Sequence, residues 1–264
     1  SITSNAGIQT IQLKAGYFGP VWHITTNGSD ETGDGTAEHP FETIQRGVNA
    51  SAGGDTVLVS VGNYIGNISI DKEINLIGEH PESTMLDGNN DGYIITIEEQ
   101  TNQNIGIDNF TLKNGNGGIM NLSQSGNLKI SNTILHSNNQ YAIWHSSSDS
   151  LLLSNVTVSN NINGWGVVIG IDNSGHIDIK NSIIYNESDQ GILLGYYSTA
   201  TASIQYSNIL GGESSIVTNV GEGGTYEWGD GNIDVDPLFC GVDDYLLAEN
   251  SPAVGSGENG TDMG

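Results

Sequence analysis

Short apolar runs recur along the chain at a nearly fixed period. Four of them, residues 107–112, 130–135, 153–158 and 179–184, carry an asparagine at the third position. These shared residues are Asn109, Asn132, Asn155 and Asn181, which lie 23, 23 and 26 residues apart. Further short apolar runs begin at Ile94, Ile119, Ile143, Val167, Ile192 and Ile216. Each period therefore holds about three strands of three to five residues, without a helical spacing of 3.6 residues.

A repeat of about 23 residues with three short strands is typical of one rung of a right-handed parallel β-helix. One rung cannot bury its inward face alone, whereas rungs stacked about 4.8 Å apart form a continuous core. We expect the shared asparagines at a sharp bend, because Asn tolerates the left-handed conformation and its amide can bond to the equivalent amide one rung away. A β-sandwich with recurrent Asn turns is the alternative, but it does not predict a fixed period. The predicted fold class is all-β.

The two ends of the chain depart from the repeat. Phe41, Ile44 and Val48 follow a helical spacing and predict a short amphipathic helix that covers the open first rung. The first 20 residues predict a strand that packs on the stack or is lent to a neighbouring copy. The predicted organisation is an N-terminal extension (1–20), a cap with the short helix (21–53), the rungs (54–230) and a C-terminal capping segment (231–264).

Several motifs near both ends resemble those of secreted bacterial right-handed parallel β-helix proteins. They are found at residues 33–36, 40–45, 54–59, 62–64, 74–78 and 86–88, and near the C-terminus at residues 232–239, 245–248 and 250–255. The resemblance covers roughly residues 22–264. It implies the fold, but the group includes pectate-lyase-like polysaccharide-active proteins, glycosidases and surface adhesins, so it implies no single activity.

The charge of the chain excludes several classes of partner. Thirty-one Asp and Glu oppose six Lys and Arg, a formal net charge of −25. Nucleic-acid binding requires clustered cations and is excluded. No apolar run approaches the roughly 18 residues of a membrane span, so we expect no membrane insertion. Cys240 is the only cysteine, which excludes a disulfide framework. The acidic, cysteine-poor composition favours a secreted or cell-surface protein of bacterial, extracellular origin.

Two sets of residues are candidates for catalysis. Lys113 and His136 each follow a shared asparagine by four positions, so adjacent rungs place them in one outward column. A polysaccharide lyase needs such a base beside the α-proton of a uronate. Asp149 and Asp172 lie near the ends of apolar runs in successive rungs, where a glycosidase would need converging carboxylates. The alternative is a solvated lysine beside a partly exposed histidine, with ordinary loop aspartates.

A possible binding surface lies on the face formed by the runs that begin at Ile94 and its equivalents. Strict alternation predicts one outward column on this face, formed by Met120, Trp144, Val168, Leu193 and Val217. With His145, Tyr196 and Tyr197 nearby, this column predicts either a surface that stacks a sugar ring or an apolar stripe covered by a loop or a neighbouring subunit.

The function most consistent with these patterns is an acidic structural, adhesive or carbohydrate-binding scaffold. Its expected partners are a polysaccharide or surface glycan, or copies of itself in an assembly. The alternative is a polysaccharide-degrading enzyme, either a calcium-dependent lyase or a glycosidase. Asp30, Glu31 and Asp34 lie in a glycine-rich loop whose oxygen ligands suit calcium, although a solvated turn explains them equally.

Overall fold

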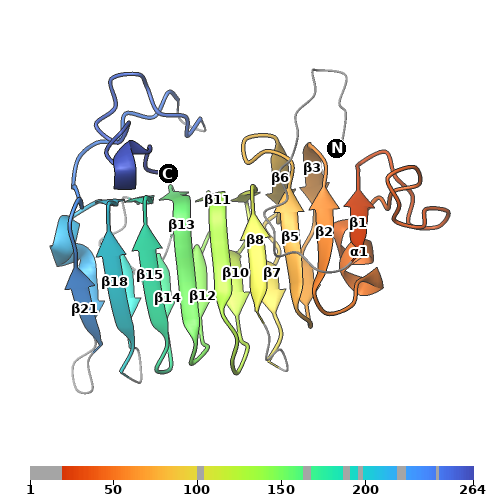
Figure 1. Ribbon diagram of the computed structural model, residues 1–264, viewed down its shortest axis with the longest axis horizontal. Helices are drawn as coiled ribbons and strands as arrows, with labels where there is room; N and C mark the ends of the chain where they lie inside the picture. The colour runs from red at the N-terminus through yellow and green to blue at the C-terminus, as the bar shows by residue number, and fades with distance from the viewer. Residues whose placement is uncertain are drawn as a thin grey trace.

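The chain winds as a right-handed parallel β-helix, which confirms the predicted fold (Figure 1). The computed structural model describes residues 20–99, 104–162, 168–186, 191–195, 199–218, 224–241 and 244–264. Every pairing between named strands in this part of the chain is parallel. Residues 1–19 of the predicted N-terminal extension lie outside the described residues. None of the described helices is long and apolar enough to cross a membrane.

Each rung contributes strands to three faces. The first face contains β1 (Val21–Ile24), β2 (Asp55–Val59), β5 (Ile74–Gly78), β8 (Ile105–Asp108), the first halves of β11 (Leu128–His136) and β13 (Ser150–Ser159), β15 (His176–Lys180), β18 (Thr201–Gln205) and β21 (Thr225–Trp228). The second contains β3 (Gly62–Ile65), β6 (Thr84–Asp87), β9 (Thr111–Lys113), the second halves of β11 and β13, β16 (Ile183–Tyr185) and β19 (Asn208–Ile209). The third contains β4 (Ile68–Ile70), β7 (Tyr93–Ile97), β10 (Gly117–Asn121), β12 (Ile143–His145), β14 (Ile169–Ile171), β17 (Ile192–Leu194) and β20 (Ile216–Thr218).

The shared asparagines form the bend between the first and second faces. Asn109, Asn132, Asn155 and Asn181 have φ of 64°, 47°, 56° and 51°, in the left-handed region that Asn tolerates. The amide-to-amide bonding expected of them is absent, since no hydrogen bond among the described residues joins two of these four side chains. Asn132 instead donates through Nδ2 to Asp108 Oδ1 at 2.8 Å.

An asparagine ladder does exist, but at the bend between the second and third faces. Asn138 Nδ2 donates to Asn161 Oδ1 at 2.9 Å, and the Asn161 backbone N–H donates to Asn186 Oδ1 at 2.6 Å. All three residues are buried. Buried polar groups need hydrogen-bond partners, and those at the bend lie outside the strand pairing. The asparagine ladder provides these partners.

The apolar core runs through the centre of the coil and is covered at its N-terminal end. The predicted helix is α1 (Ile44–Ala50), which begins at the N-cap Thr43 and buries Ile44, Gly47 and Val48. The helix contacts β1, β2 and β4. It therefore blocks part of the exposed end of the coil, as strand edges in natural proteins usually are.

The C-terminal segment, residues 231–264, turns back along the coil instead of only covering the last rung (Figure 1). Ala253 and Met263 pack on Ile183 of the second face. The Gly264 N–H donates to the Asn181 carbonyl at 2.7 Å, and Lys180 Nζ lies 2.7 Å from Glu258 Oε1. The C-terminal segment thus covers part of the second face.

Candidate functional site

The outward column on the third face is centred on Trp144. Strand pairing places Met120, Trp144, Gly170 and Leu193 in successive rungs. The assignment of Val168 to this column was wrong, because Ile143 pairs with Ile169 and Val168 is buried with 0% exposure. Apolar residues at consecutive positions of this run hide the alternation that distinguishes the two sides of a strand.

Trp144 lies across the backbone of the next rung. A Cβ atom on Gly170 would lie 2.3 Å from Trp144 Cε3 and 2.4 Å from Cζ3, so only glycine leaves room for the indole. Tyr141 also contacts the indole, in a tilted arrangement with ring centroids 4.5 Å apart and an interplanar angle of 48°. Both aromatic side chains are half-buried. They therefore present part of their rings to solvent in a fixed orientation.

Tyr93 extends this surface in the same way, because its ring also lies over a glycine of the next rung. It pairs with Gly117, where a Cβ atom would lie 2.2 Å from Tyr93 Cε1. The Tyr93 hydroxyl donates to Gln140 Oε1 at 3.1 Å, and burial raises the pKa of the phenol to about 12, so it remains a donor at neutral pH. We call Tyr93, Tyr141 and Trp144 the aromatic platform. Tyr93 and Tyr141 were not among the predicted site residues. For Tyr93, the available signal was Gly117, which lies in register one rung later.

The strands that carry the aromatic platform are uncharged, and the one charged residue in the turn before Tyr93 is the acidic Asp91. None of the described third-face strands contains Asp, Glu, Lys or Arg. The adjacent turns instead supply amides, and Asn139 Nδ2 donates to Asn90 Oδ1 at 3.2 Å. Amide groups both donate and accept hydrogen bonds. The platform therefore suits a ligand with hydroxyl groups and apolar faces, without a formal charge.

Three other residues were predicted to contribute to this surface, and of these the structure describes His145. Tyr196 and Tyr197 lie outside the described residues. His145 points into the coil and is fully buried. Its Nδ1 accepts from Asn121 Nδ2 at 2.9 Å, and its Nε2 donates to the Asp149 carbonyl at 3.1 Å, a pattern that only the neutral imidazole fits. His145 is thus a structural residue and cannot contact a surface ligand.

The buried His145 predicts a loss of stability in mild acid. Burial lowers the pKa of His145 below its usual value, so the unfolded chain binds a proton that the folded chain does not as the pH falls through about 6.5. Stability therefore decreases with falling pH, by up to about 1.4 kcal/mol per pH unit for this one proton, until the folded-state pKa is reached. His23, whose pKa is also lowered by burial, adds a contribution of the same sign.

Melting temperatures between pH 8 and pH 5 measure this effect. We expect His145→Asn to flatten the pH dependence, while His39→Asn, at an exposed position, leaves the slope unchanged. Equal slopes in wild type and His145→Asn would contradict the assignment.

Lys113 and His136 lie side by side on the second face, as the register of β9 and β11 shows. They line a cavity of about 440 Å³ between this face and the C-terminal segment, together with Glu82, Asp244 and Tyr245. We call it the second-face cleft. The Tyr245 ring packs on the His136 ring at a centroid distance of 4.8 Å, and His136 Nδ1 lies 2.9 Å from Ser137 Oγ. Lys113 makes no side-chain hydrogen bond or ion pair within the described residues.

Asp149 and Asp172 do not join this cleft. Asp149 Oδ2 accepts the backbone N–H of Gly126 at 2.5 Å, and Asp172 Oδ1 accepts that of Asn173 at 2.8 Å. Both residues lie in turns between the third and first faces. Each carboxylate therefore holds a turn, which is a common role for loop aspartates.

Two of the three predicted calcium ligands are bound to the chain itself. Asp30 accepts the backbone N–H groups of Glu42 and Thr43 at 2.8 and 3.0 Å, next to the helix N-cap. Asp34 accepts the Thr36 N–H at 3.0 Å, and Glu31 is exposed. Within the described ranges, no three His, Cys, Asp or Glu side chains gather closely enough to hold a metal ion. Calcium binding stays a prediction.

Comparisons with known proteins address the fold. No protein-family model matches the chain. No curated protein matches it by sequence. Among solved structures, the chain is similar to a rhamnogalacturonan lyase with a TM-score of 0.46 and 11% sequence identity, over 73% of this chain and 68% of that one. A similarity at this level says nothing of activity or substrate.

Proposed function

We propose that this protein is a carbohydrate-binding β-helix module whose aromatic platform holds a neutral polysaccharide on the third face. The observation that carries the proposal is the position of Trp144, whose indole lies over Gly170 and against Tyr141 with part of its surface open. A ring held this way loses little conformational freedom when a flat ligand stacks on it.

The chemistry of the platform favours a neutral sugar chain over a charged one. The C–H faces of a pyranose ring pack on aromatic rings, and its hydroxyl groups pair with amides such as those of Asn139 and Gln140. The third-face strands offer no cation to a uronate, and the net charge of −25 repels polyanions. Strands stacked about 4.8 Å apart repeat along the coil, which matches the repeating nature of a polysaccharide.

The location of the protein is also part of the proposal. A secreted or cell-surface location is supported by the acidic composition and the single cysteine. In that setting, binding at the third face makes the module an adhesive scaffold. Self-association and calcium binding are separate expectations, which light scattering and melting in excess chelator test.

Affinity electrophoresis in gels containing neutral glucans, chitin, pectate or alginate tests the binding. We expect a neutral polymer to retard the wild-type protein, and Trp144→Ala to weaken the interaction roughly tenfold, about 1.4 kcal/mol. Trp228→Ala is the matched control, because Trp228 is half-buried at the end of the first face. The two variants should have similar melting temperatures. Equal retardation of Trp144→Ala and wild type would exclude the platform as the binding site.

Polysaccharide cleavage is the second candidate function, and the second-face cleft favours it. The cleft brings Lys113, which has no ion-pair partner among the described residues, next to His136, with the carboxylates of Glu82 and Asp244 in the same lining. A base and an acid within one cleft are what lyase or hydrolase chemistry requires. Product formation on the same panel, lost in Lys113→Ala but kept in Lys129→Ala, would establish this function. Absence of turnover on every polymer would leave binding alone.

A further inference from the structure

Three strands, β1, β3 and β4, have an edge that faces the N-terminal end of the coil, and the edges of β1 and β4 are covered. At β1, the His23 N–H donates to the Gly35 carbonyl at 2.8 Å, and the Thr25 N–H donates to the Phe41 carbonyl at 3.0 Å. At β4, the Gln45 side chain replaces a missing strand. Its Oε1 accepts the Ser69 N–H at 2.8 Å, and its Nε2 donates to the Ser69 carbonyl at 3.1 Å.

The third edge, that of β3, is open as far as the described residues go. Among them, the one strand that pairs with β3 is β6. The N–H groups of Gly62 and Gly66 donate toward this partner at 2.8 and 2.9 Å. Because backbone groups alternate in direction along a strand, those of Asn63 and Ile65 point away from β6. Within the described residues, these two backbones have no hydrogen-bond partner.

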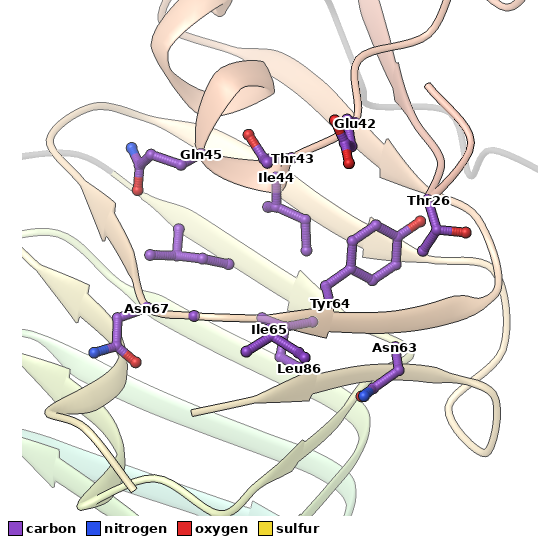
Figure 2. Close-up of a pocket in the computed structure, with 12 residues that line it drawn as sticks. Thr26, Glu42, Thr43, Ile44, Gln45, Asn63, Tyr64, Ile65, Asn67 and Leu86 are labelled. Atoms are coloured by element: carbon purple, nitrogen blue, oxygen red, sulfur yellow. The ribbon is translucent and has the colours of Figure 1, made fainter. Parts of the chain in front are cut away.

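A pocket of about 290 Å³ lies along this open edge (Figure 2). Ile44 of α1, Tyr64 and Leu86 give it an apolar lining, and Glu42 stands at its rim. Ile65 is 73% exposed beside it. An open strand edge with apolar side chains is what natural proteins usually avoid, since it invites another strand. The edge of β3 thus differs from those of β1 and β4, which the chain itself covers.

We propose that the open edge of β3 is a strand-addition site, and that the strand it takes is the N-terminal segment of the same chain, residues 1–19. Unpaired N–H and C=O groups at alternate positions are complementary to an extended polypeptide. The apolar lining favours an added strand with apolar side chains at alternate positions. Acidic side chains in that strand would be repelled by Glu42 at the rim and by the negative net charge. This site is separate from the aromatic platform and does not depend on glycan binding.

The sequence of the N-terminal segment has these properties. It contains no Asp or Glu, although the whole chain has 31 of them. Ile11 and Leu13 alternate with Thr10 and Gln12. Nineteen residues at about 3.3 Å each reach roughly 60 Å when extended, more than the width of one rung. The segment joins the coil at Pro20, whose carbonyl accepts the Thr56 N–H at 3.2 Å.

Amide hydrogen exchange of the full chain, followed by NMR, tests the proposal. In the wild type we expect the N–H groups of Asn63 and Ile65 to be protected. The double variant Ile11→Asp/Leu13→Asp should increase their exchange rates at least tenfold, because two carboxylates replace the apolar side chains. The matched control Thr10→Asp/Gln12→Asp adds the same charge at the alternate positions and should keep the protection.

The Tyr64 amide serves as the internal reference, because it pairs with β6. It should remain protected in all variants. Fast exchange of Asn63 and Ile65 in the wild type, or protection that survives both double variants, would overturn the proposal. So would equal losses in the two variants, or loss of protection at Tyr64 as well. Protection that disappears on dilution would assign the strand to a second copy and contradict the intramolecular site.

Discussion

Replacing Asn161 by alanine is expected to lower the free energy of unfolding by about 4 kcal/mol, because its buried amide serves four partners. Its Oδ1 accepts from the Asn138 backbone N–H at 3.2 Å and from Asn138 Nδ2 at 2.9 Å. Its Nδ2 donates to the carbonyls of Leu135 and Ser159, both at 3.0 Å. At 3% exposure, water does not easily replace it.

Chemical denaturation of the wild type and the variant measures this change. Asn139→Ala is the control, since the neighbouring Asn139 is exposed and its side chain makes one amide contact, to Asn90 at 3.2 Å. We expect the control to cost no more than about 0.5 kcal/mol. Similar losses in the two variants would show that the ladder does not stabilise the bend.

A methyl group at Gly170 is expected to damage both the stability and the binding surface. Because its Cβ would lie 2.3 Å from the Trp144 ring, the indole must leave its position. Overpacking of this kind costs about 2 kcal/mol, although alanine normally stabilises a strand relative to glycine. Glycan affinity should fall roughly tenfold, as in Trp144→Ala.

A double-mutant cycle separates the ring contact from other effects. In the Trp144→Ala background, Gly170→Ala should stabilise the protein by roughly 0.5–1 kcal/mol and leave the residual affinity unchanged. If Gly170→Ala is equally destabilising with and without the indole, the ring contact is not its cause.

The repeat itself made the fold and the first bend predictable. The bend between the first and second faces requires a left-handed residue in successive rungs, and few residue types tolerate this conformation, so Asn109 and its equivalents recur at a nearly fixed spacing. The ladder was harder to predict. Asn138 and Asn161 follow their bend asparagines by six residues but Asn186 follows Asn181 by five, so no constant spacing marks the three as one column.

The candidate sites were predictable only where they depend on that spacing. Lys113 and His136 follow equivalent asparagines by the same number of residues, so their adjacency could be read from the sequence. The packing of Tyr245 on His136 could not, because the C-terminal segment has no period that links it to the second face. The support of Trp144 by Gly170 also depends on a register that consecutive apolar residues concealed.

The central claim, that Trp144 stacks on a neutral glycan, is tested most directly by its own fluorescence. The chain has four tryptophans, and replacing Trp22, Trp165 and Trp228 with phenylalanine leaves Trp144 as the sole indole emitter. We predict a saturable shift in its emission on titration with the neutral oligosaccharide selected by electrophoresis, with the same half-saturation as wild-type binding. Binding of that oligosaccharide with no change in the Trp144 emission would contradict the claim.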